Sequence, residues 1–62
     1  MNFVQVVKSS VIGILEDKIN TILENNKESR LIDIKVSATY NGSAPVYIAV
    51  ILFEREINSS GN

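Results

Sequence analysis

The sequence contains no cysteine and no histidine, and these two absences exclude several classes of protein. Without cysteine the chain can form neither a disulfide nor a thiolate metal site. Without histidine a zinc site would need carboxylates alone, which is an improbable ligand set. We therefore expect no structural metal and no cofactor. A domain of only 62 residues that lacks these supports usually gains its stability by oligomerisation.

The chain also lacks a strong excess of charge of either sign. Six basic residues against seven acidic ones give a formal net charge of −1, and the two signs are interspersed. A duplex nucleic-acid binder and a binder of anionic membranes both need a basic patch, so we expect neither partner. No segment approaches the ~20 apolar residues of a membrane span. The first residues do not resemble a signal peptide either, so we expect a cytoplasmic protein.

Residues that could perform catalysis are scarce. There is no histidine to act as a general base, no cysteine nucleophile, and no serine with a recognisable activating base. Glu54 and Glu56 lie two residues apart in a predicted strand, where a pair of solvated carboxylates is the expected arrangement. The glycine-rich motifs that bind phosphates are absent. We predict that the protein is not an enzyme and has no catalytic or metal-binding residues.

The distribution of apolar residues predicts one helix and three strands in the order β-α-β-β. Val and Phe side chains predict a strand over residues 2–8, and apolar positions spaced three and four apart predict a helix over residues 11–25. Residues 30–40 alternate between apolar and polar, which is typical of a half-buried strand. Residues 46–56 form the third predicted strand, and residues 58–62 form a polar C-terminal tail.

The expected ends of these elements rest on small polar residues, glycine and proline. Ser9 or Ser10 is expected to cap the helix N-terminus, and the Asn25-Asn26 pair to end it in a left-handed conformation. Gly13 either destabilises the helix or permits its close approach to the sheet. The segment 41–43, Asn-Gly-Ser, predicts a hairpin turn, with Pro45 in the loop.

We predict an α+β fold formed by a single βαββ domain over residues 1–57. The longest and most apolar strand, the third, is placed in the centre of a three-stranded mixed sheet of order 1-3-2. This is a split βαβ unit, half of a ferredoxin-like fold. The helix covers one face of the sheet, and the other face is expected to lie at an oligomer interface.

The predicted register decides which side chains lie on each face. Pairing Tyr40 with Val46 places Val36 opposite Val50, and these apolar pairs are expected beneath the helix. The opposite face then carries apolar side chains that one short helix cannot cover. We predict that these form the contact with a second copy of the chain: Tyr47, Ala49, Ile51 and Phe53.

A ligand at this interface would need cations, flat rings and a polar side chain. Lys35, with Arg30 or Arg55, could supply positive charge to a pocket for a small anionic, nucleotide-like ligand. Tyr40 and Tyr47 could stack on a flat ring, and Asn41 could bind a polar edge. Each has a simpler alternative: a register-setting ion pair of Lys35 with Asp33, packing for the tyrosines, and turn chemistry for the asparagine.

Three parts of the chain together resemble a family of very small proteins: the helix, the segment Leu31-Ile32-Asp33-Ile34-Lys35, and the segment running from Tyr47 to Glu54. Its members come from spore-forming bacteria and their phages, and one branch is expressed in the mother cell during sporulation. The resemblance implies the βαββ shape but no assigned biochemistry. By analogy with other tiny phage proteins, it suggests a non-catalytic counter-defence protein that sequesters a nucleotide-type immune signal between subunits. The alternative is a protein–protein interaction module that acts on a host or sporulation protein.

Overall fold

The computed structural model describes residues 1–55, and over these residues the chain forms three strands and one helix in the predicted order. The elements are β1 (Asn2–Ser9), α1 (Ile12–Asn25), β2 (Arg30–Asn41) and β3 (Ala44–Glu54). The sheet has the order β1-β3-β2, and both outer strands run antiparallel to β3. The predicted α+β class, element order and sheet order are confirmed, but the sheet is antiparallel throughout rather than mixed, because β1 and β2 are parallel to each other yet both pair only with β3. The predicted tail over residues 58–62 lies outside the described residues.

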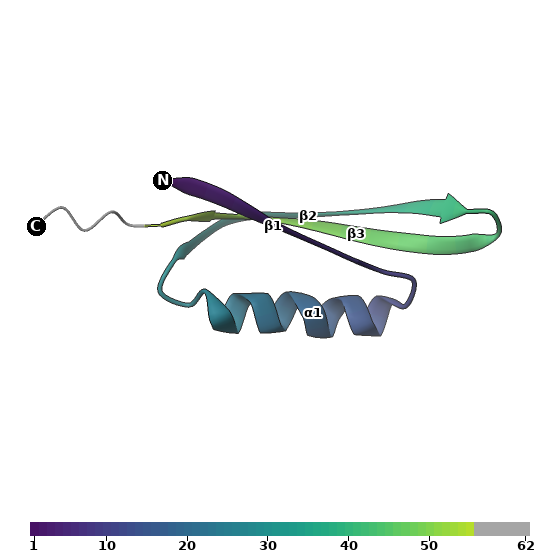
Figure 1. Cartoon of the computed structure of the whole chain (residues 1–62), viewed down its shortest axis with the longest axis horizontal. Helices are drawn as coiled ribbons and strands as arrows, with labels where there is room; N and C mark the ends of the chain where they lie inside the picture. Colours follow the sequence, from purple (N-terminus) through teal and green to yellow (C-terminus); the bar gives the residue numbers. More distant parts are fainter. Residues whose placement is uncertain (56–62) are drawn as a thin grey trace, which may run out of the picture.

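The helix covers one face of the sheet, and no element of the described chain lies on the other (Figure 1). It packs mainly on β1 and β3. The hairpin end of β2 and β3 projects past the start of α1, which makes the described part of the chain elongated. The molecule therefore consists of two layers whose outer sheet surface has no cover.

The turn between β2 and β3 is tighter than predicted. Asn41 pairs with Ala44, so the loop contains only Gly42 and Ser43. Gly42 has φ of +68°, a left-handed conformation that glycine adopts without steric cost. Pro45 belongs to β3 rather than to the loop. It is tolerated because β1 ends opposite Tyr47, so β3 has a neighbour on only one side at this point, as in an edge strand.

This tighter turn shifts the register by one residue, and the predicted register is wrong. Val46 pairs with Thr39 instead of Tyr40, and Ala49 rather than Val50 lies opposite Val36. Because side chains alternate between the two faces, a shift of one residue exchanges the two faces of β3. Its odd-numbered residues lie under the helix.

The predicted interface residues are therefore placed on the wrong face. Ala49 and Ile51 are 0% exposed and Phe53 is 1% exposed. Tyr47, on the same face, is half-buried. Side chains buried beneath a helix of their own chain cannot contact a second copy in this conformation. β3 is apolar on both faces, but the side chains that the helix leaves uncovered are those of its even-numbered residues.

The ends of the helix also differ from those predicted. Val11 precedes the first helical residue, and no side chain caps it. The Ser9 hydroxyl instead accepts a hydrogen bond from the Val11 amide at 3.1 Å, a local turn outside the helix. At the other end Asn26 has φ of −121°, not a left-handed conformation, and its side-chain amide donates to the Ile22 carbonyl at 2.8 Å. A β-bulge between Leu31 and Asp33 adds one further irregularity at the start of β2.

The core is small and lies where α1 crosses β1 and β3. Four apolar residues of the described chain are fully buried, with Leu15 of the helix packed against the odd-numbered face of β3. The rings of Phe3 and Phe53 stack with their centroids 5.2 Å apart and extend the core toward the N-terminus. Each large buried side chain contributes about 1.5–3 kcal/mol relative to exposure. So few buried residues give a narrow margin of stability, because ordering each residue costs free energy of similar size.

Within residues 1–55 no helix has both the length and the apolar character needed to span a membrane.

Candidate functional site: the open sheet face

We call the sheet face opposite α1 the open face. Its members follow from the ladder, since residues directly opposite each other in antiparallel strands point to the same side. β1 contributes Asn2, Val4, Val6 and Lys8; β2 contributes Arg30, Asp33, Lys35, Ser37, Thr39 and Asn41; β3 contributes Ala44, Val46, Ile48, Val50, Leu52 and Glu54.

An aliphatic strip occupies the part of the open face formed by β1 and β3. It consists of Val4, Val6, Ile48, Val50 and Leu52. Val4 is 55% exposed and Val6 is 60% exposed, although both lie in a regular strand. Contiguous apolar surface of this kind, bordered by polar side chains, marks an interaction site more often than a bare surface of a monomer.

Polar and charged side chains border the strip along β2 and at its two ends. On β2 the Lys35 ammonium lies 3.6 Å from the Asp33 carboxylate. At one end of the strip the Arg30 guanidinium donates through its Nε to the Glu54 carboxylate at 3.0 Å. Lys8 lies at the other end, opposite Ile48, and within residues 1–55 no salt bridge involves it. An apolar centre with a polar border is the usual composition of a protein–protein contact.

The predicted ligand-binding residues do not converge within one copy of the chain. Arg30 and Lys35 lie on the open face and are paired with carboxylates of the same chain. The Arg55 guanidinium lies on the helix side, with its Cζ 4.8 Å from the centroid of the Phe3 ring. Tyr40 and Asn41 lie at the hairpin end, at the opposite end of the sheet.

The tyrosines differ from one another in their surroundings. Both occupy the helix face, but Tyr47 is half-buried whereas Tyr40 is 71% exposed. Tyr40 lies opposite Pro45 on the hairpin arm, beyond the start of the helix. Because both tyrosines lie on the helix side, neither contacts a ligand that is bound on the open face with Arg30.

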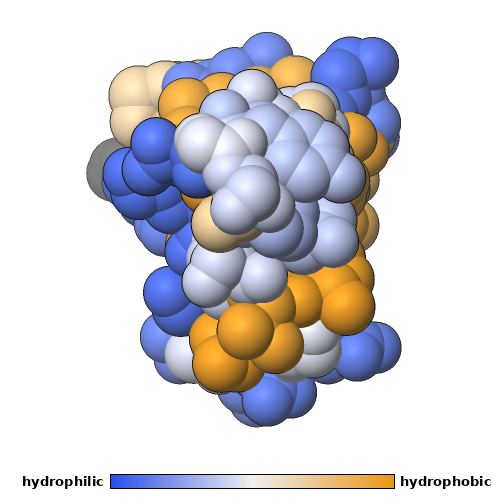
Figure 2. All heavy atoms as spheres, turned by 90° about the vertical axis from the view of Figure 1, so that its right-hand side faces the viewer, coloured by the Kyte–Doolittle hydropathy of each residue, from blue (hydrophilic) through white to orange (hydrophobic). Residues whose placement is uncertain are grey.

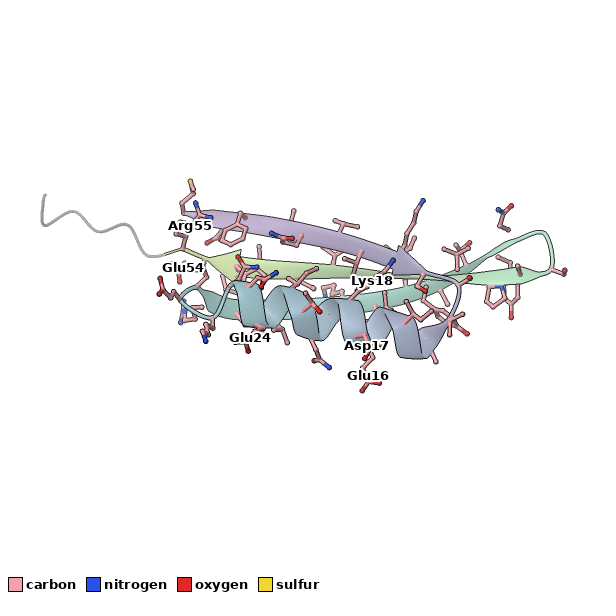
Figure 3. The ribbon with its side chains drawn as sticks, turned by 60° about the horizontal axis from the view of Figure 1, so that its bottom comes forward. Glu16, Asp17, Lys18, Glu24, Glu54 and Arg55 are labelled. Carbon is pink, nitrogen blue, oxygen red and sulfur yellow. The ribbon has the colours of Figure 1, made fainter. Side chains whose placement is uncertain are left out.

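The charges of the helix do not form a site either. Figure 3 shows Glu16 and Asp17 directed away from the sheet, while Lys18 points toward the end of β1. The Lys18 ammonium donates to the Lys8 carbonyl at 3.1 Å. Glu24 pairs with Lys27 on the surface at 3.1 Å. In the part of the chain that the structure describes, no group of three or more acidic, cysteine or histidine residues is arranged to hold a metal ion.

A second apolar area surrounds the start of α1. Figure 2 shows hydrophobic atoms gathered below the hairpin tip, over the beginning of the helix. Val11, Ile12 and Ile14 are all about half exposed there. A shallow apolar hollow between the helix and β2 is lined by Ile12, Leu15, Ile19 and Val36, among others. It exists because α1 packs on β1 and β3 and leaves β2 largely uncovered on this side.

Sequence reasoning missed the aliphatic strip itself. The sequence carried one signal for it: Val4 and Val6 alternate with Gln5 in a strand next to β3, so they share a face. Phe3 and Val7 on the other face of this strand are apolar as well, so β1 alone does not decide which face of β3 is covered. The structure places Gln5 opposite Ile51 on the helix side.

Comparisons with models of protein families, with curated proteins and with solved structures find no match to this chain. The resemblance to small sporulation and phage proteins therefore stays a prediction.

Proposed function

We propose that the protein is a non-catalytic binding protein that works as a homo-oligomer, with the open face as its assembly surface. One observation carries this proposal: the aliphatic strip of Val4, Val6, Ile48, Val50 and Leu52 has no cover from the described chain. A second copy is the favoured occupant because the face carries a cation, Lys8, at one end of the strip and a carboxylate, Glu54, at the other, so that the surface can complement itself.

The small size of the core supports the same proposal. Four fully buried residues hold the two layers together, whereas covering the strip would bury several more aliphatic side chains at about 1.5–3 kcal/mol each. For a domain whose total stability is about 5 kcal/mol, that contribution is comparable with the whole. Assembly would thus complete the fold.

A small anionic, nucleotide-like molecule remains the ligand class that we propose for the assembled protein. The residues in question are Arg30, Lys35, Arg55, Tyr40, Tyr47 and Asn41. Of these, Arg30, Lys35 and Asn41 lie on the open face, where assembly can bring the side chains of two copies together, and they are the residues that favour a site between subunits. Arg55, Tyr40 and Tyr47 lie on the helix side and do not line a site on this face. In the form that the resemblance suggests, such a protein would sequester a nucleotide-type immune signal in the cytoplasm.

Two measurements on the purified full chain test this proposal. Multi-angle light scattering at rising concentration is expected to give a mass that is a multiple of 6.9 kDa. Titration calorimetry of that oligomer against cyclic nucleotides and ADP-ribose nucleotides is expected to show heat with at least one class. A monomer at every concentration contradicts the assembly. An oligomer that binds no nucleotide contradicts the ligand class and leaves assembly in place.

A different outcome of the same experiments would favour the alternative function. If the chain is a monomer that forms a stoichiometric complex with a host protein, then the open face serves a heterologous partner. In that case the substitution Val6→Asp should abolish the complex, and Ser43→Asp in the hairpin turn should leave it intact.

A further inference from the structure

The open face is self-complementary in one orientation, and this orientation defines how two copies meet. The relevant side chains form four successive rows across the sheet. Listed from the hairpin side toward the chain termini, they are Lys8, Ile48 and Ser37; then Val6, Val50 and Lys35; then Val4, Leu52 and Asp33; and last Asn2, Glu54 and Arg30.

Two sheets that pack face to face with aligned strands can be related by either of two two-fold axes. An axis along the strands would place β1 of one copy on β2 of the other, so that Val6 would cover Lys35 of the second copy. That arrangement removes the Lys35 ammonium from water against aliphatic carbon, which is costly, and it also places Glu54 over Glu54 of the second copy, so that like charges meet. It would also keep the Lys8 rows of both copies at the same end.

An axis across the strands keeps each strand above its own equivalent and reverses the order of the rows. When the axis passes between the second and third rows, Val6 faces Val4 of the second copy, and Val50 faces Leu52. Lys35 then lies over Asp33 of the second copy. The first row of one copy lies over the fourth row of the other, so that Lys8 lies over Asn2, on the strand next to Glu54, and Ile48 lies over Glu54.

We propose that a second copy of the chain covers the open face in this antiparallel orientation, with Lys8 of each copy next to Glu54 of the other. This inference rests on the proposed homo-oligomer and specifies its geometry. It gives a role to Lys8, which is exposed at the end of an aliphatic strip and has no ion-pair partner among residues 1–55. It also places opposite charges together at both ends of the contact, because the two-fold axis repeats each pair.

A cross-link between Lys8 and Glu54 tests this geometry, because the two residues are too far apart within one copy to be joined. Glu54 lies opposite Asn2, and Lys8 is six residues further along β1. At about 3.3 Å per residue, this separation is about 20 Å within one copy, far beyond direct contact. A zero-length carbodiimide reagent joins an amine to a carboxylate only when the two groups touch. A covalent Lys8–Glu54 link can therefore form only between copies.

The experiment treats the wild-type protein with carbodiimide at a concentration where light scattering shows the oligomer, and then maps cross-linked peptides in the dimer band by mass spectrometry. We expect the Lys8–Glu54 peptide pair. We also expect Lys8→Glu to weaken assembly about tenfold, since it creates two like-charge contacts per dimer. The matched control is Lys18→Glu, the same charge change on the helix side of the sheet, which should leave assembly within twofold of wild type.

The outcomes separate this geometry from the proposed function. An oligomer whose dimer band contains other cross-links but no Lys8–Glu54 pair overturns the antiparallel orientation, while self-assembly stands. Equal effects of Lys8→Glu and Lys18→Glu on assembly overturn it as well. A wild-type protein that remains monomeric overturns the proposed homo-oligomer itself.

Discussion

The two faces of β3 are equally apolar, yet they have opposite fates. Ala49, Ile51 and Phe53 are completely buried beneath α1, whereas Val50, between them in sequence, is 38% exposed on the open face. The amino acids do not explain this difference, because valine and leucine on one side are as hydrophobic as isoleucine and alanine on the other. The difference comes from the presence of a single helix. The apolar side chains that stay uncovered on the open face form the surface that we assign to assembly.

The largest expected effect separates two neighbours on β3. Ile51→Ala should lower the free energy of unfolding by about 2–5 kcal/mol, since it leaves a cavity in a core with few other members. Val50→Ala should lower the stability of the isolated subunit by less, because its side chain is already partly in water, and should instead weaken assembly. Urea unfolding followed by circular dichroism, at low and high protein concentration, measures both. Equal losses in the free energy of unfolding for Ile51→Ala and Val50→Ala would contradict the distinction between the two faces.

The second effect concerns the aliphatic strip on β1. Val6→Asp should convert the oligomer into monomer, because a carboxylate on the strip would lose its water of hydration on assembly. The far-ultraviolet spectrum at low temperature should be retained, since Val6 contributes little to the core.

Sedimentation velocity of Val6→Asp beside the control Ser43→Asp, which places the same charge in the hairpin turn, measures this effect. An unchanged sedimentation coefficient for Val6→Asp would exclude the strip from the interface.

A smaller effect, a gain in stability rather than a loss, is expected for a substitution within the helix. An added Cβ at Gly13 would meet no atom within 4 Å, so close approach of the helix to the sheet is not the reason for this glycine. Gly13→Ala should stabilise the protein by about 0.5–1 kcal/mol, because alanine loses less backbone entropy on folding. Thermal unfolding checks the sign. A loss of stability would show that the position is constrained by a contact made only in the assembly.

The smallest effect is expected on the outer surface of the helix. Glu24→Ala removes an exposed pair with Lys27 three residues away, and such pairs contribute about 0.2–0.5 kcal/mol. Thermal unfolding and light scattering should both be close to wild type. A change in mass would place this surface, rather than the open face, at a subunit contact.

The element order and sheet order could be predicted because they rest on strong local signals. The spacing of Leu15 and Ile19 gives the helix, and the alternation through Ile34 and Val36 gives β2. The central position of β3 followed from its two apolar faces. These inferences do not depend on knowing the turn to within one residue.

The site could not be predicted because the choice of face depends on the exact length of the turn between β2 and β3. Assigning Pro45 to the loop lengthened the turn, shifted the register and exchanged the faces of β3. A proline in a central strand is ordinarily excluded, and it is allowed here only because β1 ends opposite Tyr47. The length of a neighbouring strand is a property of the folded sheet and is not visible in the residues around Pro45.

The most direct test of the central claim is an isotope-filtered nuclear Overhauser measurement on an equal mixture of ¹³C-labelled and unlabelled protein. We expect contacts between copies at the methyl groups of Val4, Val6, Val50 and Leu52, and none at Ile51 or Leu15. Intermolecular contacts absent from the strip, in a folded protein at millimolar concentration, would contradict it.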